Sequence, residues 1–267
     1  MRYAVAIWNY MEPGTDFLAL IDEFVGLGYD AIAAQARQFT DLDTDQADAL
    51  VSYLHERDLQ VAVHGNFDTD LADLRMVHSL LGDRLRTVTF DAAMRPDSRG
   101  QLFDTARMAG FLGQIIEMTP SACLKVAVED FPLDATGLEF YREDLQPLLE
   151  CPRYGILIDV GHLNLRLAAG GYFEGVTVDE YFRRLPLPVV EVHLHDNRGK
   201  KDDHAHFGYG DVDFAQVRRA LKAIGFDGLS TIEIAPTFHG STPQQSKPRA
   251  RESLQTWRAL WEGTTDT

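Results

Sequence analysis

The sequence predicts an α/β protein, namely a single (β/α)8 TIM barrel that occupies residues 1–267 as one domain. Three features predict this fold. Short apolar segments recur along the whole chain, segments with helical periodicity separate them, and acidic or imidazole side chains end most of the apolar segments. Parallel strands need a crossover helix between them, so repeated strand–helix units favour a closed barrel, with a doubly wound open sheet as the alternative.

The expected strands are short and almost entirely apolar, as is typical of strands that are buried on both faces. They are expected at residues 3–8, 31–34, 59–64, 85–90, 124–129, 155–159, 189–194 and 229–234.

The segments between the strands carry apolar residues at helical spacing. Two such stripes are Phe17, Leu20, Ile21 and Phe24, and Ala47, Leu50, Val51 and Leu54. A later helix has an expected start and stop, because Asp213 with Gln216 resembles a capping box and Gly225 follows its apolar stripe. These patterns predict amphipathic helices packed on the outside of a sheet.

Composition and charge narrow the classes of function. The formal net charge of -16 disfavours nucleic acid as a partner, because nucleic-acid-binding proteins usually present a basic surface to phosphate. The two cysteines, Cys123 and Cys151, form no pattern typical of disulfides or zinc fingers. The sequence shows neither a signal-like leader nor a long apolar span, so we expect a cytoplasmic protein with no membrane partner.

Polar residues with ligand chemistry end the predicted strands, where (β/α)8 barrels place their active sites. They are His64, Asp91, Glu129, Asp159, His193 and Glu233. Strand alternation puts Glu129 on the face opposite the valines that flank Ala127, and it separates Asp159 from the isoleucines before it. These acids are therefore predicted to face the barrel axis.

Several carboxylates that converge in a barrel would repel one another unless a cation neutralised them. Glu129, Asp159 and Glu233, together with His193, are thus predicted to bind a divalent metal ion. One imidazole among oxygen ligands suits Mn, Mg, Co or Zn, and the ligand types do not choose among these metals. For a single acid, a helix cap or a loop hydrogen bond is the alternative.

A second group of residues could hold another metal ion. His162 follows Asp159 by three residues, and Asp202 and His204 lie in a loop ahead of Gly208-Tyr-Gly210. The alternatives are that His162 caps a helix or contacts substrate, and that the loop is only solvated. His195 is expected to point the same way as His193, with His193 as the ligand and His195 in contact with substrate or with an acid beside the metal.

These motifs resemble those of the xylose isomerase-like barrel superfamily, which includes sugar isomerases, ketose 3-epimerases and endonuclease IV. The resemblance runs from about His64 to Glu233. It implies a metal held by Glu129, Asp159, His193 and Glu233, with Glu129 and Glu233 also acting as the acid and base that move a proton beside a metal-chelated carbonyl. It further implies a sugar-like substrate contacted by His64, His162, His195 and Arg198, and a homodimer.

Other functions remain open. Endonuclease IV is a zinc phosphodiesterase, and His162, Asp202 and His204 match the order of its third-metal ligands, but Asp91 stands where that family needs a second histidine after His64. A lyase or dehydratase, or a member of the superfamily that only binds a sugar, has the same ligand pattern. The acidic charge favours sugar chemistry among these alternatives.

Overall fold

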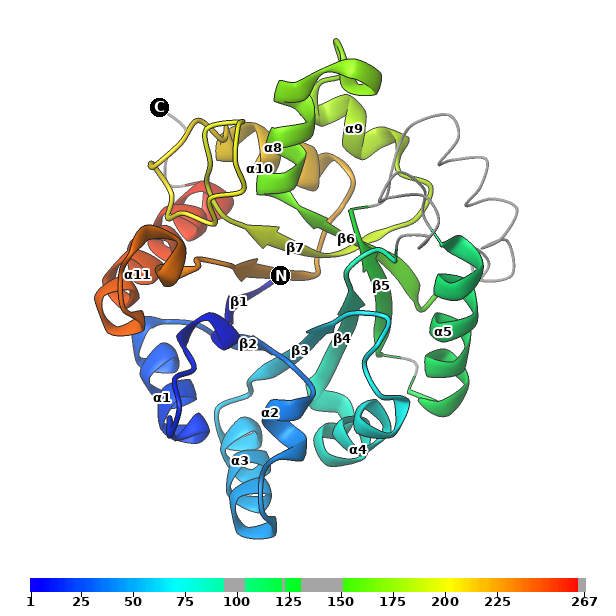
Figure 1. Ribbon diagram of the computed structural model, residues 1–267, viewed down its shortest axis with the longest axis vertical. Helices are drawn as coiled ribbons and strands as arrows, with labels where there is room; N and C mark the ends of the chain where they lie inside the picture. The colour runs from blue at the N-terminus through cyan, green and yellow to red at the C-terminus, as the bar shows by residue number, and fades with distance from the viewer. Residues whose placement is uncertain (94–103, 122, 131–150, 264–267) are drawn as a thin grey trace. The chain divides into compact units, whose positions relative to one another are not determined.

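Eight strands close into a parallel barrel in which each strand lies beside its neighbours in sequence, from β1 to β8 (Figure 1). The computed structural model describes residues 1–93, 104–121, 123–130 and 151–263. The strands are β1 Arg2–Ala6, β2 Ala31–Ala34, β3 Gln60–Gly65, β4 Leu85–Phe90, β5 Lys125–Glu129, β6 Tyr154–Asp159, β7 Val189–Leu194 and β8 Leu229–Ile232. The closed barrel confirms the predicted fold class.

The structure corrects the ends of two predicted strands. Residues 7 and 8 were expected in the first strand, but they begin the 3-10 helix η1 (Ile7–Tyr10), in which Met11 N–H bonds back to the Trp8 carbonyl. The last strand ends at Ile232 instead of residue 234, because its pairing with β1 runs only from Arg2↔Leu229 to Val5↔Ile232. Glu233 therefore lies in the segment that leaves the strand.

The contacts of the chain divide it into two compact units, which we call unit 1 and unit 2. Unit 1 comprises Met1–Ala33, Ile158–Leu185 and Glu191–Thr267, and unit 2 comprises Ala34–Leu157 and Pro186–Val190. That residues 1–267 form one domain stays a prediction.

Unit 1 is built on β1, which pairs with β2 and β8, and on β7, which pairs with β8. Its helices are α1 Phe17–Leu27, α8 Val160–Ala169, η4 Gly171–Phe173, α9 Val178–Arg184, α10 Phe214–Ala223, η5 Pro236–His239 and α11 Pro243–Glu262. Helix α10 contacts both α9 and α11, and α11 also contacts β8. The ring of Phe214 stacks on Phe207 at 3.6 Å and meets buried Trp257 at 6.5 Å, so an aromatic layer joins α10 to α11.

The helical stripes of the sequence are largely the buried faces of these helices. Phe17, Leu20, Ile21 and Phe24 are all buried in α1. At α10 the expected capping box forms on one side only. The Asp213 side chain accepts a bond from Gln216 N–H at 2.8 Å, whereas the Gln216 side chain donates to Asp179 at 3.4 Å. Gly225, with φ of 72°, follows the helix as expected.

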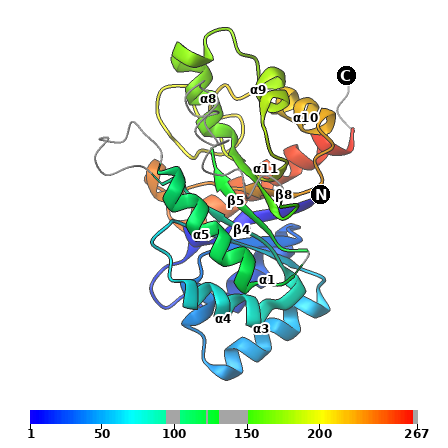
Figure 2. The same ribbon diagram turned by 90° about the vertical axis from the view of Figure 1, so that its right-hand side faces the viewer.

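Unit 2 contains β3, β4, β5 and most of β6, each hydrogen-bonded to the next. Its helices are α2 Arg37–Thr40, α3 Thr44–Glu56, α4 Leu71–Leu81, η2 Gly82–Arg84 and α5 Thr105–Met118. Helix α4 contacts both α3 and α5 (Figure 2). In the second predicted stripe, Leu50 and Leu54 are buried, while Ala47 and Val51 are half-buried.

Apolar residues of β5, β6 and β7 pack together beneath the end of β5, where Glu129 lies. Ala127 forms a buried cluster with Leu157 and Val190, and Glu129 pairs in register with Leu157. Because side chains two residues apart share a face of a strand, Glu129 lies on the same face as Ala127. The alternation that the sequence predicts for β5 is thus present.

Within the described residues, none of the helices combines the length and the apolar character needed to cross a membrane.

Gly155 provides a test of barrel packing in unit 2. A Cβ at Gly155 would lie 2.5 Å from Val190 Cγ1 and 2.8 Å from the Pro188 carbonyl oxygen. Gly155→Ala should therefore lower the free energy of unfolding by about 1–3 kcal/mol, as overpacking of a core typically does. Urea unfolding measures this. Gly113→Ala in α5 is the matched control, because a Cβ there meets none of the described residues within 4 Å, and it should stabilise by about 0.5–1 kcal/mol. Equal effects of the two variants would contradict the prediction.

Candidate functional site

Asp159 joins the end of β6 to the start of α8. Its side chain is fully buried and accepts a hydrogen bond at 2.7 Å from the backbone N–H of His162, so it acts as the N-cap of the helix. The cap places the His162 ring beside the carboxylate, with Nδ1 4.0 Å from Asp159 Oδ1. The alternative that His162 caps the helix is wrong, since Asp159 does so. The three-residue spacing instead brings an acid and an imidazole to one strand end.

His193 and His195 lie at the end of β7 and contact different carboxylates. His193 Nδ1 lies 2.8 Å from Glu233 Oε2, and its Nε2 lies 3.4 Å from Glu191 Oε1. His195 Nε2 lies 2.9 Å from Asp159 Oδ1. Both imidazoles are almost completely buried. The nearest carboxylates of His193 and His195 are thus different.

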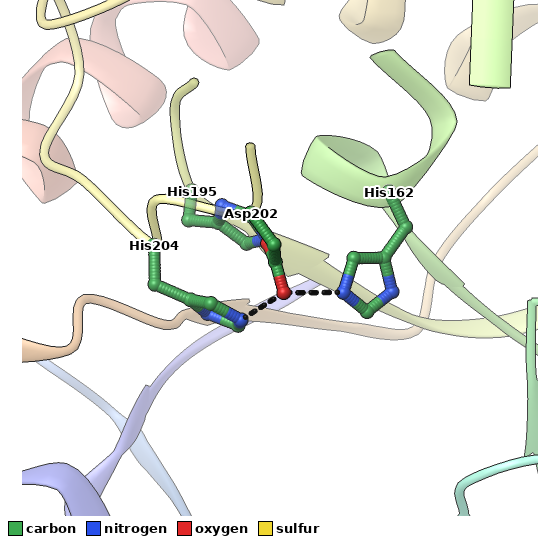
Figure 3. Close-up of side chains that lie close together, drawn as sticks. All are labelled: His162, His195, Asp202 and His204. Carbon is green, nitrogen blue, oxygen red and sulfur yellow. Dashed lines mark hydrogen bonds and ion pairs between the residues drawn. The ribbon is translucent and has the colours of Figure 1, made fainter. Parts of the chain in front are cut away.

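The loop after β7 brings Asp202 and His204 to His162 and His195. One oxygen of Asp202, Oδ2, lies 3.0 Å from both His162 Nε2 and His204 Nε2 (Figure 3). The rings of His195 and His204 stack at 3.9 Å, and His195 Nε2 lies 3.5 Å from Asp202 Oδ1. One donor atom from each of these residues lies within 4.8 Å of every other. We call His162, His195, Asp202 and His204 the histidine cluster.

The histidine cluster brings together the three residues predicted for a second metal and adds His195, which was expected to contact substrate or an acid. Among the described residues, His195 Nδ1 and Asp202 Oδ1 are buried and have no hydrogen-bond partner. Buried polar atoms of this kind normally have a partner. Donors bound to one zinc ion at about 2.0–2.1 Å lie roughly 3–4 Å apart. The residues present therefore fit a divalent cation.

A second group in unit 1 consists of Asp159, His193 and Glu233, which we call the strand-end group. Donor atoms of Asp159 and His193 lie within 4.8 Å of each other, and Glu233 contacts His193 directly. Three of the four residues predicted to bind the first metal are therefore close together in one unit. Two carboxylates with one imidazole form an oxygen-rich donor set, which also suits a divalent cation.

Glu191 belongs to the surroundings of His193 and was missed from the sequence. It is fully buried in β7, and it accepts a hydrogen bond at 2.8 Å from Thr231 Oγ1 of β8. Its position two residues before His193 was a signal that could have identified it, because alternate residues of a strand share a face. A buried glutamate beside an imidazole fixes the ring orientation and raises its basicity.

Glu129 lies in unit 2 with His64 and Asp91. His64 Nε2 is 3.5 Å from Glu129 Oε2 and 3.3 Å from Asp91 Oδ1, while its Nδ1 lies 2.9 Å from Thr89 Oγ1. The donor atoms of this third group also lie within 4.8 Å of one another. The structure thus places His64, which we expected at the substrate, beside a predicted catalytic acid.

Arg198 contacts Tyr209 and belongs to none of the three donor groups. Its side chain is exposed, its Nε donates to the Tyr209 carbonyl at 3.3 Å, and its guanidinium lies 4.6 Å from the centre of the Tyr209 ring. A role for Arg198 in substrate binding stays a prediction.

Electrostatic interactions keep the acids of unit 1 ionised in spite of their burial. Burial raises the pKa of Asp159, but the neighbouring imidazoles of His195 and His162 outweigh it and hold that pKa well below its usual value. Glu233 behaves likewise, with its pKa lowered chiefly by His193. Burial lowers the pKa of His204, yet its hydrogen bond to Asp202 and the charge of Glu233 raise it to about 9. Without a bound cation, protonated His204 offsets part of the negative charge of these carboxylates.

The fold and these donor groups define a (β/α)8 barrel protein with strand-end acids and histidines suited to divalent cations. The chain belongs to the xylose isomerase-like TIM barrel family, whose sequence model matches residues 104–260.

Curated relatives match part of the chain. The uncharacterized protein MJ1311 of Methanocaldococcus jannaschii is 32% identical over 125 residues, which are 46% of this chain and 41% of that protein. Fructoselysine 3-epimerase of Shigella flexneri is 26% identical over 115 residues, or 42% of this chain and 37% of the epimerase. The matches thus span less than half the length of these relatives.

Solved structures of the same fold cover nearly the whole chain. The D-psicose 3-epimerase of Clostridium cellulolyticum H10, solved with D-tagatose, has a TM-score of 0.71 and 12% identity and covers 98% of this chain and 99% of its own. The IOLI protein with a bound zinc atom has a TM-score of 0.68 and 14% identity over 100% of both chains. At these identities the likeness establishes the fold alone.

The histidine cluster predicts a specific effect of removing one imidazole. His204→Ala should lower the number of divalent ions per chain by one, because it removes a donor that shares Asp202 Oδ2 with His162. Elemental mass spectrometry after dialysis against zinc measures the ratio. The control is His206→Ala on the same loop, whose Nδ1 lies 3.0 Å from a backbone carbonyl and outside the cluster. An unchanged ratio in His204→Ala would show that the loop binds no ion.

The raised pKa of His204 predicts how the metal-free protein responds to pH. Since the folded state holds this proton up to about pH 9 and a free histidine only to about 6.5, His204 stabilises the fold fully below pH 6.5. This contribution is lost as the pH rises through 9. Urea unfolding of chelator-treated protein between pH 6 and 9.5 should show the decline. His204→Ala should show a smaller decline, and equal declines in both proteins would rule out this assignment.

Proposed function

We propose that this protein is a divalent-metal-dependent sugar isomerase or epimerase that acts on a ketose or a ketose derivative. The observation that carries the proposal is the convergence of Asp159, His193 and Glu233 at strand ends of a xylose isomerase-like barrel. The partial match to a fructoselysine 3-epimerase, and the fold shared with a psicose 3-epimerase, support a ketose as the substrate class.

The proposed ligands of the metal are Glu129, Asp159, His193 and Glu233. Pairing of Glu129 with Leu157 supports the inclusion of Glu129, because Asp159 follows Leu157 by two residues and so shares its face of β6. The buried Glu191 beside His193 supports His193 as a ligand, since ligating imidazoles commonly have a carboxylate partner on the other ring nitrogen.

When bound, a divalent ion would polarise the carbonyl and the adjacent hydroxyl of the sugar and so acidify the proton on the carbon between them. Glu129 and Glu233 are the proposed acid and base. One takes the proton as a carboxylate, and the other returns a proton to the opposite face of the same carbon. Burial raises the pKa of Glu233, but the opposite effect of His193 brings this pKa below its usual value. Glu233 is therefore ionised at neutral pH and can act as the base. Both glutamates are buried, which limits the access of water to the reacting carbon.

The remaining predicted substrate contacts are His64, His162, His195 and Arg198. The contact between His64 and Glu129 supports a role for His64 beside the reacting carbon. His162 and His195 are proposed instead as ligands of a second cation, together with Asp202 and His204, because their donor atoms converge within 4.8 Å. Three imidazoles and one carboxylate favour zinc for that position.

A second candidate function is a zinc phosphodiesterase similar to endonuclease IV. The histidine cluster favours it, since His162, Asp202 and His204 meet in the structure as that function requires. The acidic net charge of -16 opposes it, because binding of duplex nucleic acid normally requires a basic surface. Sugar chemistry is therefore the primary proposal.

The cytoplasm is the proposed location, and the free thiols of Cys123 and Cys151 agree with a reducing compartment. A homodimer is the proposed assembly.

The experiment that tests the proposed function combines metal analysis with three activity assays. Protein loaded with manganese, cobalt or zinc would be incubated with a panel of free ketoses and glycated amino acids, and with an abasic-site oligonucleotide. Interconversion of ketoses, seen by chromatography, would support the epimerase. An unsaturated product would indicate a lyase, strand cleavage would indicate the phosphodiesterase, and metal binding without any turnover would indicate a binding protein.

Substitution of the two glutamates tests their catalytic roles. Glu129→Gln and Glu233→Gln should each lower kcat by at least about 100-fold, since each variant loses a proton-transfer group and a ligand charge. Activity at saturating metal separates the loss of proton transfer from the loss of affinity. Glu252→Gln is the control, because Glu252 is exposed on α11 and pairs with Arg249. Near-normal activity in either glutamate variant would remove that residue from the mechanism.

A further inference from the structure

A buried carboxylate next to the histidine cluster makes no contact with the donor atoms of the cluster. Asp196 follows His195 directly and is 1% exposed. Its Oδ2 accepts hydrogen bonds at 2.9 Å from Gly208 N–H and Gly210 N–H, and its Oδ1 accepts one at 3.2 Å from Val212 N–H. Within the described residues, all hydrogen-bond partners of this carboxylate are backbone amides of one loop. Hydrogen bonds to an ionised group are roughly twice as strong as neutral ones.

The Gly208-Tyr-Gly210 turn is shaped to receive this carboxylate. Gly208 has φ of 84°, a conformation that glycine adopts without steric penalty. At Gly210 a Cβ would lie 2.0 Å from the Asn197 carbonyl oxygen and 2.6 Å from Asp196 Oδ1, so only glycine allows the backbone to approach this closely. The alternate amides of Gly208, Gly210 and Val212 point to one place and line a concave site for a carboxylate. In this protein the anion is the side chain of Asp196.

The backbone of Asp196 also holds the segment just before this turn, which carries Asp202 and His204. Asp196 and Ala205 exchange two backbone hydrogen bonds, of 2.8 and 3.0 Å, in an isolated antiparallel bridge. Ala205 follows His204, whose φ of 43° is unusual for a residue other than glycine. The His204 carbonyl in turn accepts a bond at 3.0 Å from Ala235 N–H, beyond β8. The strained conformation of His204 is thus held from both sides.

The Asn197 side chain forms hydrogen bonds to α8. Its Nδ2 donates to the Gly161 carbonyl at 2.9 Å, and its Oδ1 accepts from Asn164 at 3.0 Å. Gly161 immediately precedes His162, and a Cβ on Gly161 would lie 1.9 Å from the His195 ring. Adjacent residues after β7 therefore position the loop that carries Asp202 and His204 and the helix turn that carries His162.

We propose that Asp196 is a positioning residue for a divalent cation bound by the histidine cluster, acting through its hydrogen bonds to Ala205 and to the Gly208–Val212 backbone. The proposal rests on the second cation of the proposed function and not on the identity of the substrate. Asp196 binds no ion itself. It sets the distances between His204, Asp202 and His195, and the loss of such a supporting contact typically weakens a metal site by about 10- to 100-fold.

The test is Asp196→Asn, measured by zinc titration and by hydrogen–deuterium exchange of the zinc-free protein. Asparagine has nearly the same size as aspartate, but its side chain has only one acceptor oxygen. Its NH2 group would face either Val212 N–H or the N–H groups of the two glycines, and neither can accept a hydrogen bond. We expect zinc affinity at the histidine cluster to fall about 10- to 100-fold and the amides of Ala205, Gly208 and Gly210 to exchange faster. The control is Asp213→Asn, an equal change of charge on an exposed helix cap that asparagine also fills well.

A second variant keeps the proposal testable if Asp196→Asn folds poorly. Gly208→Ala leaves the carboxylate of Asp196 in place and strains only the turn, because no atom of the described part of the chain lies within 4 Å of a Cβ at Gly208. A smaller loss of zinc affinity at the same cluster, with native circular dichroism and an unchanged ion at the strand-end group, supports the proposal.

Three results would overturn the proposal. One is wild-type zinc affinity in both the Asp196 and the Gly208 variants. Another is loss of every ion together with the native circular dichroism, which would assign Asp196 to the fold as a whole. The third is an equal ion content in wild type and His204→Ala, which would remove the second cation but leave the epimerase proposal intact. Conversely, two ions per chain without ketose turnover would refute the epimerase and leave the role of Asp196 standing.

Discussion

The attraction between the buried Asp159 carboxylate and the imidazoles around it is the interaction on which the site in unit 1 depends. A charged carboxylate in a fully buried position is strongly disfavoured unless hydrogen bonds and opposite charges compensate. Asp159 has both, since it caps α8 through His162 N–H and lies 2.9 Å from His195 Nε2. One side chain thereby fixes the first turn of α8 and the orientation of His195, so both depend on Asp159.

Much of the fold follows from local sequence patterns. Alternating apolar strands and amphipathic helices predicted the closed barrel. All six predicted strand-end residues, His64, Asp91, Glu129, Asp159, His193 and Glu233, lie within one residue of the ends of their strands. These predictions succeed because a barrel strand that is buried on both faces is almost entirely apolar in sequence, and because the functional side chains of such barrels lie where the strands end. The two misplaced strand ends, at Ala6 and Ile232, depend on where the neighbouring strand stops pairing, which is not a local property.

The roles of single residues were harder to predict for the same reason. Alternation correctly placed His193 and His195 at one strand end, but it could not show that they meet different acids, Glu233 and Asp159. Glu191 was hidden inside an apolar run, although its spacing from His193 marks its face. The role of Asp196 was not predicted, because its partners are backbone amides 12 to 16 residues further along, and backbone partners carry no side-chain signature.

The two donor groups of unit 1 differ in chemistry in a way that bears on their use. The strand-end group has two carboxylates and one imidazole, and a hard cation such as manganese or magnesium prefers oxygen ligands of this type. The histidine cluster has three imidazoles and one carboxylate, which zinc prefers. Asp159 lies at their border, because it contacts His195 of the cluster while belonging to the strand-end group. The imidazoles of the cluster lower the pKa of Asp159, and a cation held by the same imidazoles would place further positive charge beside this acid. Binding of a cation to the histidine cluster would therefore change the electrostatic potential at the strand-end group, which is proposed to bind the substrate.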